Sequence, residues 1–176
     1  MTEIILKLFG GAMICISCAM TGILYSKRGE YRINDLYELK KALVILKSEI
    51  EFAYNSLPNA FANVYGRTSP AIGNFFNDIS EKINEHSGKE LSRIWQDGLL
   101  SGFDVSCLQK EDIEIIARLG QIVGYLDKTL QINALNIAID EIDVKTAELR
   151  AVCEKNKRLY RSLGILGGLL VTILIL

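Results

Sequence analysis

The chain has 176 residues, with 20 lysines and arginines against 21 aspartates and glutamates, for a formal net charge of −1. This balance excludes proteins that bind nucleic acid through an excess of positive charge. The mean hydropathy of +0.22 is high for a soluble domain, because apolar residues are concentrated at the two ends of the chain. The length suits one domain, alone or with membrane segments.

The first segment, residues 8–25, carries no charge and is followed at once by Lys27 and Arg28. Its length predicts a transmembrane helix. Two alternatives are a cleaved signal peptide and a lipoprotein cleaved at Cys18. The first would need basic residues before the apolar run, and the second matches the usual cleavage motif only at Ser17.

The middle of the chain predicts an all-α fold with six helices, because it has few strand-like alternating runs and the whole chain has only two prolines. The first helix is expected from Asn34 or Asp35 to about Asn55. Its apolar residues recur at steps of three and four, as one helical face requires. They are Leu36, Leu39, Leu43, Leu46, Ile50, Ala53 and Leu57.

Four short helices follow, punctuated by proline and glycine. They are expected from Pro58 to Gly66, from Ser69-Pro70 to near Gly88, from Lys89 to Ser101, and from Ser106 or Leu108 to about Val123. The inward residues predicted for the last three are Ile72, Phe75, Phe76, Ile79, Ile83, Leu91, Ile94, Trp95, Leu99, Ile113, Ile116, Leu119 and Ile122.

The sixth helix begins at Asp127, which is placed to cap it, and contains no proline or glycine as far as Arg161. Its predicted face is Ile132, Leu135, Ile139, Ile142, Thr146, Leu149, Cys153, Asn156, Tyr160 and Leu163. We expect this helix to pack antiparallel to the first, with the four short helices as a distal cap. An intermolecular coiled coil is the alternative.

The last segment, residues 163–176, is uncharged but has only fourteen residues. As a helix it would be about 21 Å long, which is short for a span of roughly 30 Å. It predicts either a marginal transmembrane helix, with local bilayer thinning, or a half-inserted interfacial helix.

Basic residues cluster on the inner flanks of the two apolar segments, and we predict that they determine topology. They are Lys27, Arg28, Lys155, Lys157, Arg158 and Arg161. The predicted organisation is therefore a transmembrane segment at 1–28, a cytoplasmic helical bundle at 29–161, and a second transmembrane segment at 162–176. Both termini lie on the far side of the membrane.

No pattern predicts catalysis, a cofactor or a metal site. His86 is the only histidine, and the four cysteines lack polar partners at ligand spacing. Phosphate loops and nucleophile elbows are missing from the sequence. The acidic pairs are expected on solvated helix faces; they are Glu49 with Glu51, Glu111 with Asp112, and Asp140-Glu141 with Asp143.

Three stretches resemble the stage III sporulation protein AB family. The first is Leu39-Lys40-Lys41-Ala42-Leu43 followed by Leu46, Glu49-Ile50, Phe52, Leu57-Pro58 and Ala60. The second is Leu119-Gly120 followed by Gly124, Asp127 and Gln131. The third is Tyr160-Arg161-Ser162-Leu163-Gly164 before the apolar end. Their order and spacing carry the resemblance over nearly the whole chain.

The resemblance implies a non-enzymatic platform component of a secretion-like channel between mother cell and forespore. That family is similar to the inner-membrane platform domain of type II secretion and type IV pilus systems. The implied partners are a secretion-type ATPase encoded nearby, other channel components and the lipid bilayer, with a possible homo-oligomer. The implied place is the mother-cell membrane facing the forespore. Two other hypotheses are a membrane-anchored tether or regulator of another soluble protein, and a membrane enzyme.

Overall fold

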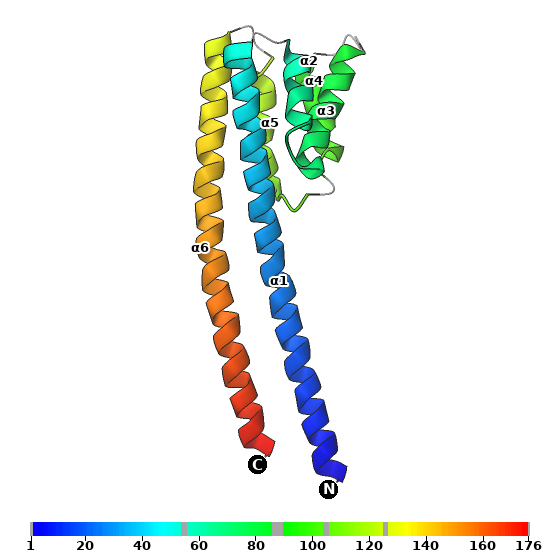
Figure 1. Ribbon diagram of the computed structural model, residues 1–176, viewed down its shortest axis with the longest axis vertical. Helices are drawn as coiled ribbons and strands as arrows, with labels where there is room; N and C mark the ends of the chain where they lie inside the picture. Colours follow the sequence, from blue (N-terminus) through cyan, green and yellow to red (C-terminus); the bar gives the residue numbers. More distant parts are fainter. Residues whose placement is uncertain (1, 54–55, 86–89, 104–105, 125–126, 176) are drawn as a thin grey trace. The chain divides into compact units, whose positions relative to one another are not determined.

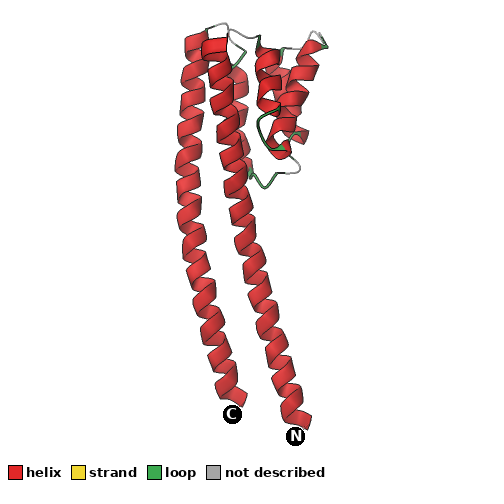
Figure 2. Ribbon diagram, viewed as in Figure 1, coloured by secondary structure: helices red, strands yellow, loops and turns green. Residues whose placement is uncertain are grey.

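The computed structural model describes residues 2–53, 56–85, 90–103, 106–124 and 127–175. Over these residues the fold is all-α, with six α-helices and no strand (Figure 2). This confirms the prediction that the fold is an all-α bundle with six helices. In the helices at the two ends, side chains are described for Gly10, Met13 and residues 27–52, and at the other end as far as Lys157 and at Leu159.

The chain divides into two compact units. The first, which we call the stem, combines Met1–Tyr31 with Glu148–Leu176. The second, which we call the bundle, is Arg32–Ala147. The division predicted from the sequence, at 1–28, 29–161 and 162–176, separates membrane segments from the domain between them. The two compact units do not test it, and it stays a prediction.

Helix α1 runs without interruption over Thr2–Ser48 and continues as the π-helical turn η1, Glu49–Ala53 (Figure 1). The expected helix start at Asn34 or Asp35 is therefore wrong. The Asp35 carboxylate does not cap its own helix; its Oδ2 accepts the backbone N–H of Cys107 at 2.7 Å. The predicted apolar face is confirmed at Leu36, Leu39, Leu43, Leu46 and Ile50, which are buried. The Ala53 side chain lies outside the described set, and Leu57 is half-buried at the start of the next helix.

The short helices are α2 (Leu57–Tyr65), α3 (Pro70–Asn84), α4 (Leu91–Ser101) and α5 (Lys110–Ile122). Prolines stand in the first turns of α2 and α3, where their missing N–H costs no hydrogen bond. Ser69 precedes α3 as predicted. Its buried hydroxyl has no hydrogen-bond partner among the described residues, however, so it supplies no side-chain cap.

The core of these helices is aromatic. The rings of Phe75 and Trp95 meet edge to face with centroids 5.1 Å apart, a favoured aromatic geometry. Phe61, Phe76 and Phe103 complete the cluster. The Trp95 indole donates to the carbonyl of Ile116 at 2.9 Å and so satisfies its buried N–H. Gly120 lies so close to this indole that a Cβ there would overlap the ring, which fixes how closely α4 and α5 pack.

Helix α6 runs over Lys128–Ile175, and Asp127 accepts the backbone N–H of Thr129 at 2.8 Å, which confirms the predicted cap. Within the bundle α6 is antiparallel to α1. Lys128 donates to the Glu51 carbonyl at 2.6 Å, and Lys40 contacts Asp143 at 2.6 Å. The deeply buried face of α6 is shifted slightly from the predicted one. It comprises Gln131, Ala134, Leu135, Ala138, Ile142 and Thr146, with Ile132 and Ile139 only half-buried.

The predicted distal cap of short helices is wrong. Helix α5 lies along α1 and α6, because Asp112 at its start contacts Arg32 and Arg118 in its middle contacts Glu141. The loop before α3 reaches the side of α1, where Ser69 N–H donates to Glu38 Oε2 at 2.7 Å. These polar contacts, between residues far apart in the sequence, show that α5 and the loop before α3 lie beside α1 and α6 and not beyond their ends.

Among the side chains that the structure describes, no helix carries a stretch long and apolar enough to cross a membrane. The backbone is helical over both apolar segments, 8–25 and 163–175. Nearly all side chains of these two segments lie outside the described set, so their transmembrane character stays a prediction.

Candidate functional site

The six predicted topology determinants all belong to the stem. Lys27, Arg28, Lys155 and Lys157 are exposed on α1 and α6. Arg158 and Arg161 lie in α6, but their side chains are outside the described set. The structure thus brings the two predicted basic clusters, more than 120 residues apart in sequence, into one unit.

Within the stem the two helices contact each other through a surface ion pair and a close approach. Lys157 Nζ donates to Glu30 Oε1 at 2.6 Å. This hydrogen bond lowers the pKa of Glu30 and raises that of Lys157, and the attraction of their charges acts in the same sense. Beside the pair, a Cβ added at Gly29 would lie 2.5 Å from Cys153 Sγ, so the glycine lets the helices approach.

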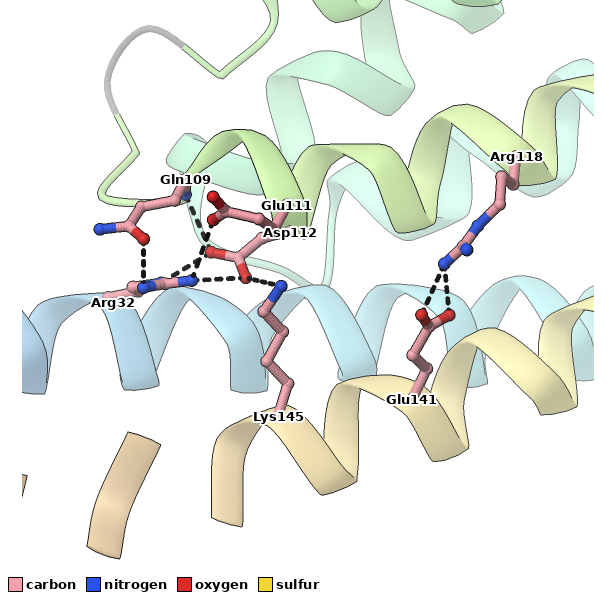
Figure 3. A network of polar contacts seen from close by, with 7 residues as sticks. All are labelled: Arg32, Gln109, Glu111, Asp112, Arg118, Glu141 and Lys145. Atoms are coloured by element: carbon pink, nitrogen blue, oxygen red, sulfur yellow. Dashed lines mark hydrogen bonds and ion pairs between the residues drawn. The ribbon is translucent and has the colours of Figure 1, made fainter. Parts of the chain in front are cut away.

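In the bundle, Asp112 is the centre of a charged cluster that ties three helices together (Figure 3). Arg32 of α1 forms a bidentate pair with it, from Nε to Oδ2 at 2.7 Å and from Nη2 to Oδ1 at 2.9 Å. Lys145 Nζ of α6 lies 3.4 Å from Oδ1. The Gln109 backbone N–H donates to Oδ2 at 2.8 Å. Every polar neighbour named here is a donor directed at the carboxylate.

The Asp112 side chain is 0% exposed, whereas those of Arg32 and Lys145 are 14% and 28% exposed. Burial by itself would raise the pKa of Asp112. The hydrogen bonds from Arg32 and Gln109 and the charges of Arg32 and Lys145 together outweigh burial, so the net pKa is lowered. The resulting stabilisation is complete above the unfolded-state pKa of about 4 and is lost as the pH falls through the lower folded-state value.

The expectation that the acidic pairs lie on solvated faces is therefore wrong for Asp112, and also for Glu49, which is 8% exposed. The exposed carboxylates Glu141 and Asp143 each join two helices, Glu141 by contact with Arg118 of α5 and Asp143 by contact with Lys40 of α1. The local sequence signal for Asp112 was weak. A capping box usually has Ser or Thr at the N-cap and Glu or Gln three positions later, whereas Gln109 and Asp112 occupy these two positions here.

Among the residues that the structure describes, those considered for chemistry do not come together in one site. No group of three or more His, Cys, Asp or Glu residues that could hold a metal occurs among the described residues. His86 lies outside the described residues, as do the side chains of Cys15 and Cys18. Cys107 is exposed and Cys153 is half-buried, and both are free thiols.

Helix α6 also carries an exposed apolar row on the bundle. Leu130, Ile137 and Val144 are 53%, 67% and 60% exposed, and they stand seven residues apart. We call these three residues the outer stripe of α6. The face predicted for this helix from the sequence leaves these three residues out, in agreement with their exposure.

Comparison with known proteins assigns the chain to a family. The family model described as stage III sporulation protein AB matches residues 7–176. The stage III sporulation protein AB of Bacillus subtilis (strain 168) is 25% identical over 171 residues, which are 97% of this chain and 99% of that protein. A solved structure of a stage III sporulation protein AB has the same fold, with a TM-score of 0.65 at 19% identity, over 70% of this chain and 97% of that one. These matches confirm the resemblance, and the chain belongs to the stage III sporulation protein AB family.

Proposed function

We propose that this chain is a non-enzymatic membrane platform component of a secretion-like apparatus that connects mother cell and forespore during sporulation. The observation that carries the proposal is the family match over residues 7–176. It is supported by the bundle, whose charged cluster is centred on a buried residue. The Asp112 carboxylate contacts Arg32, Lys145 and the backbone at the start of α5. Such a cluster serves to hold helices together.

The proposed partner of the bundle is a cytoplasmic secretion-type ATPase encoded nearby. Support comes from the exposed apolar residues on α6, because groups of exposed apolar side chains often belong to surfaces that bind another protein. A platform of this type would transmit movements of the ATPase through α1 and α6, each of which continues from the bundle into the stem.

The ATPase proposal is tested by binding between purified full-length chain in lipid nanodiscs and the purified ATPase. We expect saturable binding, with no binding to empty nanodiscs. A matched control is a chain carrying the core substitution Phe75→Asp, which removes the folded bundle and leaves the stem sequence unchanged. Absence of binding to the wild-type chain, with circular dichroism showing it fully helical, would contradict the ATPase proposal.

We further propose that residues 29–161 face the mother-cell cytoplasm and that both termini lie on the other side of the membrane. The support is the position of the basic residues, with Lys27, Arg28 and Lys155 on the inner flanks of the apolar segments. The far flanks offer only Glu3 and Lys7. Both apolar segments would then cross the bilayer.

Thiol labelling checks this orientation, because Cys107 is exposed on the bundle. In a variant with Cys15, Cys18 and Cys153 changed to serine, we expect an impermeant maleimide to label Cys107 only after the membrane is opened. A cysteine added after Leu176 should be labelled in intact protoplasts. The reverse pattern, with Cys107 labelled from outside, would rule out the proposed orientation, and Cys107→Ser gives the background signal.

A further inference from the structure

The bundle segment of α6 has two apolar faces, and only one of them is covered. Leu135 and Ile142 are fully buried against the rest of the bundle. The outer stripe, Leu130, Ile137 and Val144, is more than half exposed. Large apolar residues exposed on one face of a protein are often part of a functional surface.

The spacing of the outer stripe suits contact with another helix. Residues seven apart in an α-helix are about 20° short of two full turns, so the three side chains form a nearly straight row. Such rows are the apolar edge that one amphipathic helix presents to another. The other apolar residues exposed on the bundle helices have no run of three at this spacing among the described side chains.

The charges that border the stripe are mainly negative. On α6 itself, Asp140, Glu141 and Asp143 lie between Ile137 and Lys145. Glu141 is paired with Arg118 of α5, Asp143 with Lys40 of α1, and Lys145 lies near the buried Asp112. Asp140 has no ion pair among the described residues, so it is the charge beside the stripe that remains for a partner. A complementary partner therefore carries lysine or arginine beside its apolar residues.

The same charges disfavour a second copy of this chain as the occupant. Two copies with the same topology in one membrane have parallel α6 helices. A symmetric parallel pairing on the stripe sets Asp140 against Asp140 and Glu141 against Glu141 of the other copy. Like charges at such positions select against pairing.

We propose that the outer stripe of α6 is the docking surface for an amphipathic helix of the ATPase, whose apolar edge is bordered by lysine and arginine. This rests on the proposed function and names the surface through which it acts. The stripe alone is smaller than a standard interface of roughly 800 Å² per partner, so the bordering charges contribute and the complex is expected to be salt-sensitive.

The test measures binding of the ATPase to full-length chain in nanodiscs, using the same substitution at two valines. Val144→Glu is expected to weaken binding about tenfold or more, because it places a charge within the apolar row of the contact. Val44→Glu is the matched control, since Val44 is an exposed valine on α1 of the same bundle. It should leave binding within about twofold of wild type. Circular dichroism verifies that both variants are folded.

A charge reversal checks the chemistry of the partner. Asp140→Lys should weaken binding severalfold at low salt and flatten the dependence of affinity on salt, because it removes attraction to basic side chains. Unchanged binding and an unchanged salt dependence would show that the partner surface is not the basic one proposed.

The outcomes separate the two proposals. If the wild-type chain does not bind the ATPase, the proposed function fails and the docking surface fails with it. If the wild-type chain binds and Val144→Glu binds equally well, only the docking surface is overturned. A dimer of the wild-type chain that Val144→Glu converts to a monomer would assign the stripe to a second copy and would likewise overturn the proposal.

Discussion

Replacing Asp112 with asparagine is expected to lower the free energy of unfolding of the bundle by about 2–4 kcal/mol. Removing one member of a fully buried ion pair costs roughly 3–5 kcal/mol. The range is reduced here because Arg32 and Lys145 keep some contact with water, at 14% and 28% exposure. Asparagine has nearly the same size as aspartate, so the loss reports charge and hydrogen bonding rather than a cavity.

The geometry explains why an amide cannot replace this carboxylate. Oδ2 accepts from Arg32 Nε and from the Gln109 N–H, and Oδ1 accepts from Arg32 Nη2 with Lys145 nearby. An amide NH2 in either position faces donors, so at least two contacts are lost whichever way it turns. Arg32 then loses the buried carboxylate with which it forms its bidentate pair.

Chemical denaturation of the full chain in detergent measures the effect, because Trp95 is the only tryptophan and lies in the bundle core. Asp143→Asn is the matched control. It removes the charge of an exposed carboxylate paired with Lys40, and should cost less than about 1 kcal/mol. Equal effects of the two substitutions would mean that burial of Asp112 adds nothing to stability.

The pH dependence gives an independent check on Asp112. Its pKa is lowered in the folded chain, so the unfolded chain binds a proton at higher pH than the folded one. Acid therefore destabilises the wild type as the pH falls below about 4. The Asp112→Asn variant should lose stability less steeply over that interval, and identical slopes would be evidence against the pairing.

Replacing Gly120 with alanine is expected to destabilise the bundle by about 2–3 kcal/mol. The added methyl group would overlap the Trp95 ring, which is fully buried and held by its hydrogen bond to the Ile116 carbonyl. The indole is rigid and packed against Phe61 and Phe75, so it cannot yield without moving α4 away from α5. Alanine ordinarily favours helix over glycine, so a loss of stability would isolate the steric effect.

Gly66→Ala is the matched control for this prediction. Gly66 follows α2 at φ −67°, which an alanine adopts without strain, and nothing lies within 4 Å of an added Cβ. That substitution should be neutral or stabilising by about 0.4–1 kcal/mol. Thermal unfolding followed by Trp95 fluorescence compares the two variants. A stable Gly120→Ala chain with unchanged fluorescence would disprove the close packing of α4 on α5.

Much of this fold follows from local sequence patterns. The all-α class, the starts of α2 and α3 at their prolines, the Asp127 cap and the buried face of α1 were all predicted correctly. These features depend on residues no more than a few positions apart, so helical periodicity and capping chemistry are enough to identify them. The family, too, could be recognised from short stretches in a fixed order.

The tertiary structure alone decided the role of the charged residues. Asp112 and Arg32 are 80 positions apart, and no local pattern shows that they meet. Asp35 was expected to begin a helix and instead receives the Cys107 N–H inside an unbroken α1. For α6, helical periodicity predicted part of the buried face correctly, at Leu135, Ile142 and Thr146. The burial of Gln131, Ala134 and Ala138 was not predicted, because it depends on where the other helices of the bundle pack against α6. The sequence thus determines the helix and the approximate direction of its apolar face, and long-range contacts determine which residues that face finally buries.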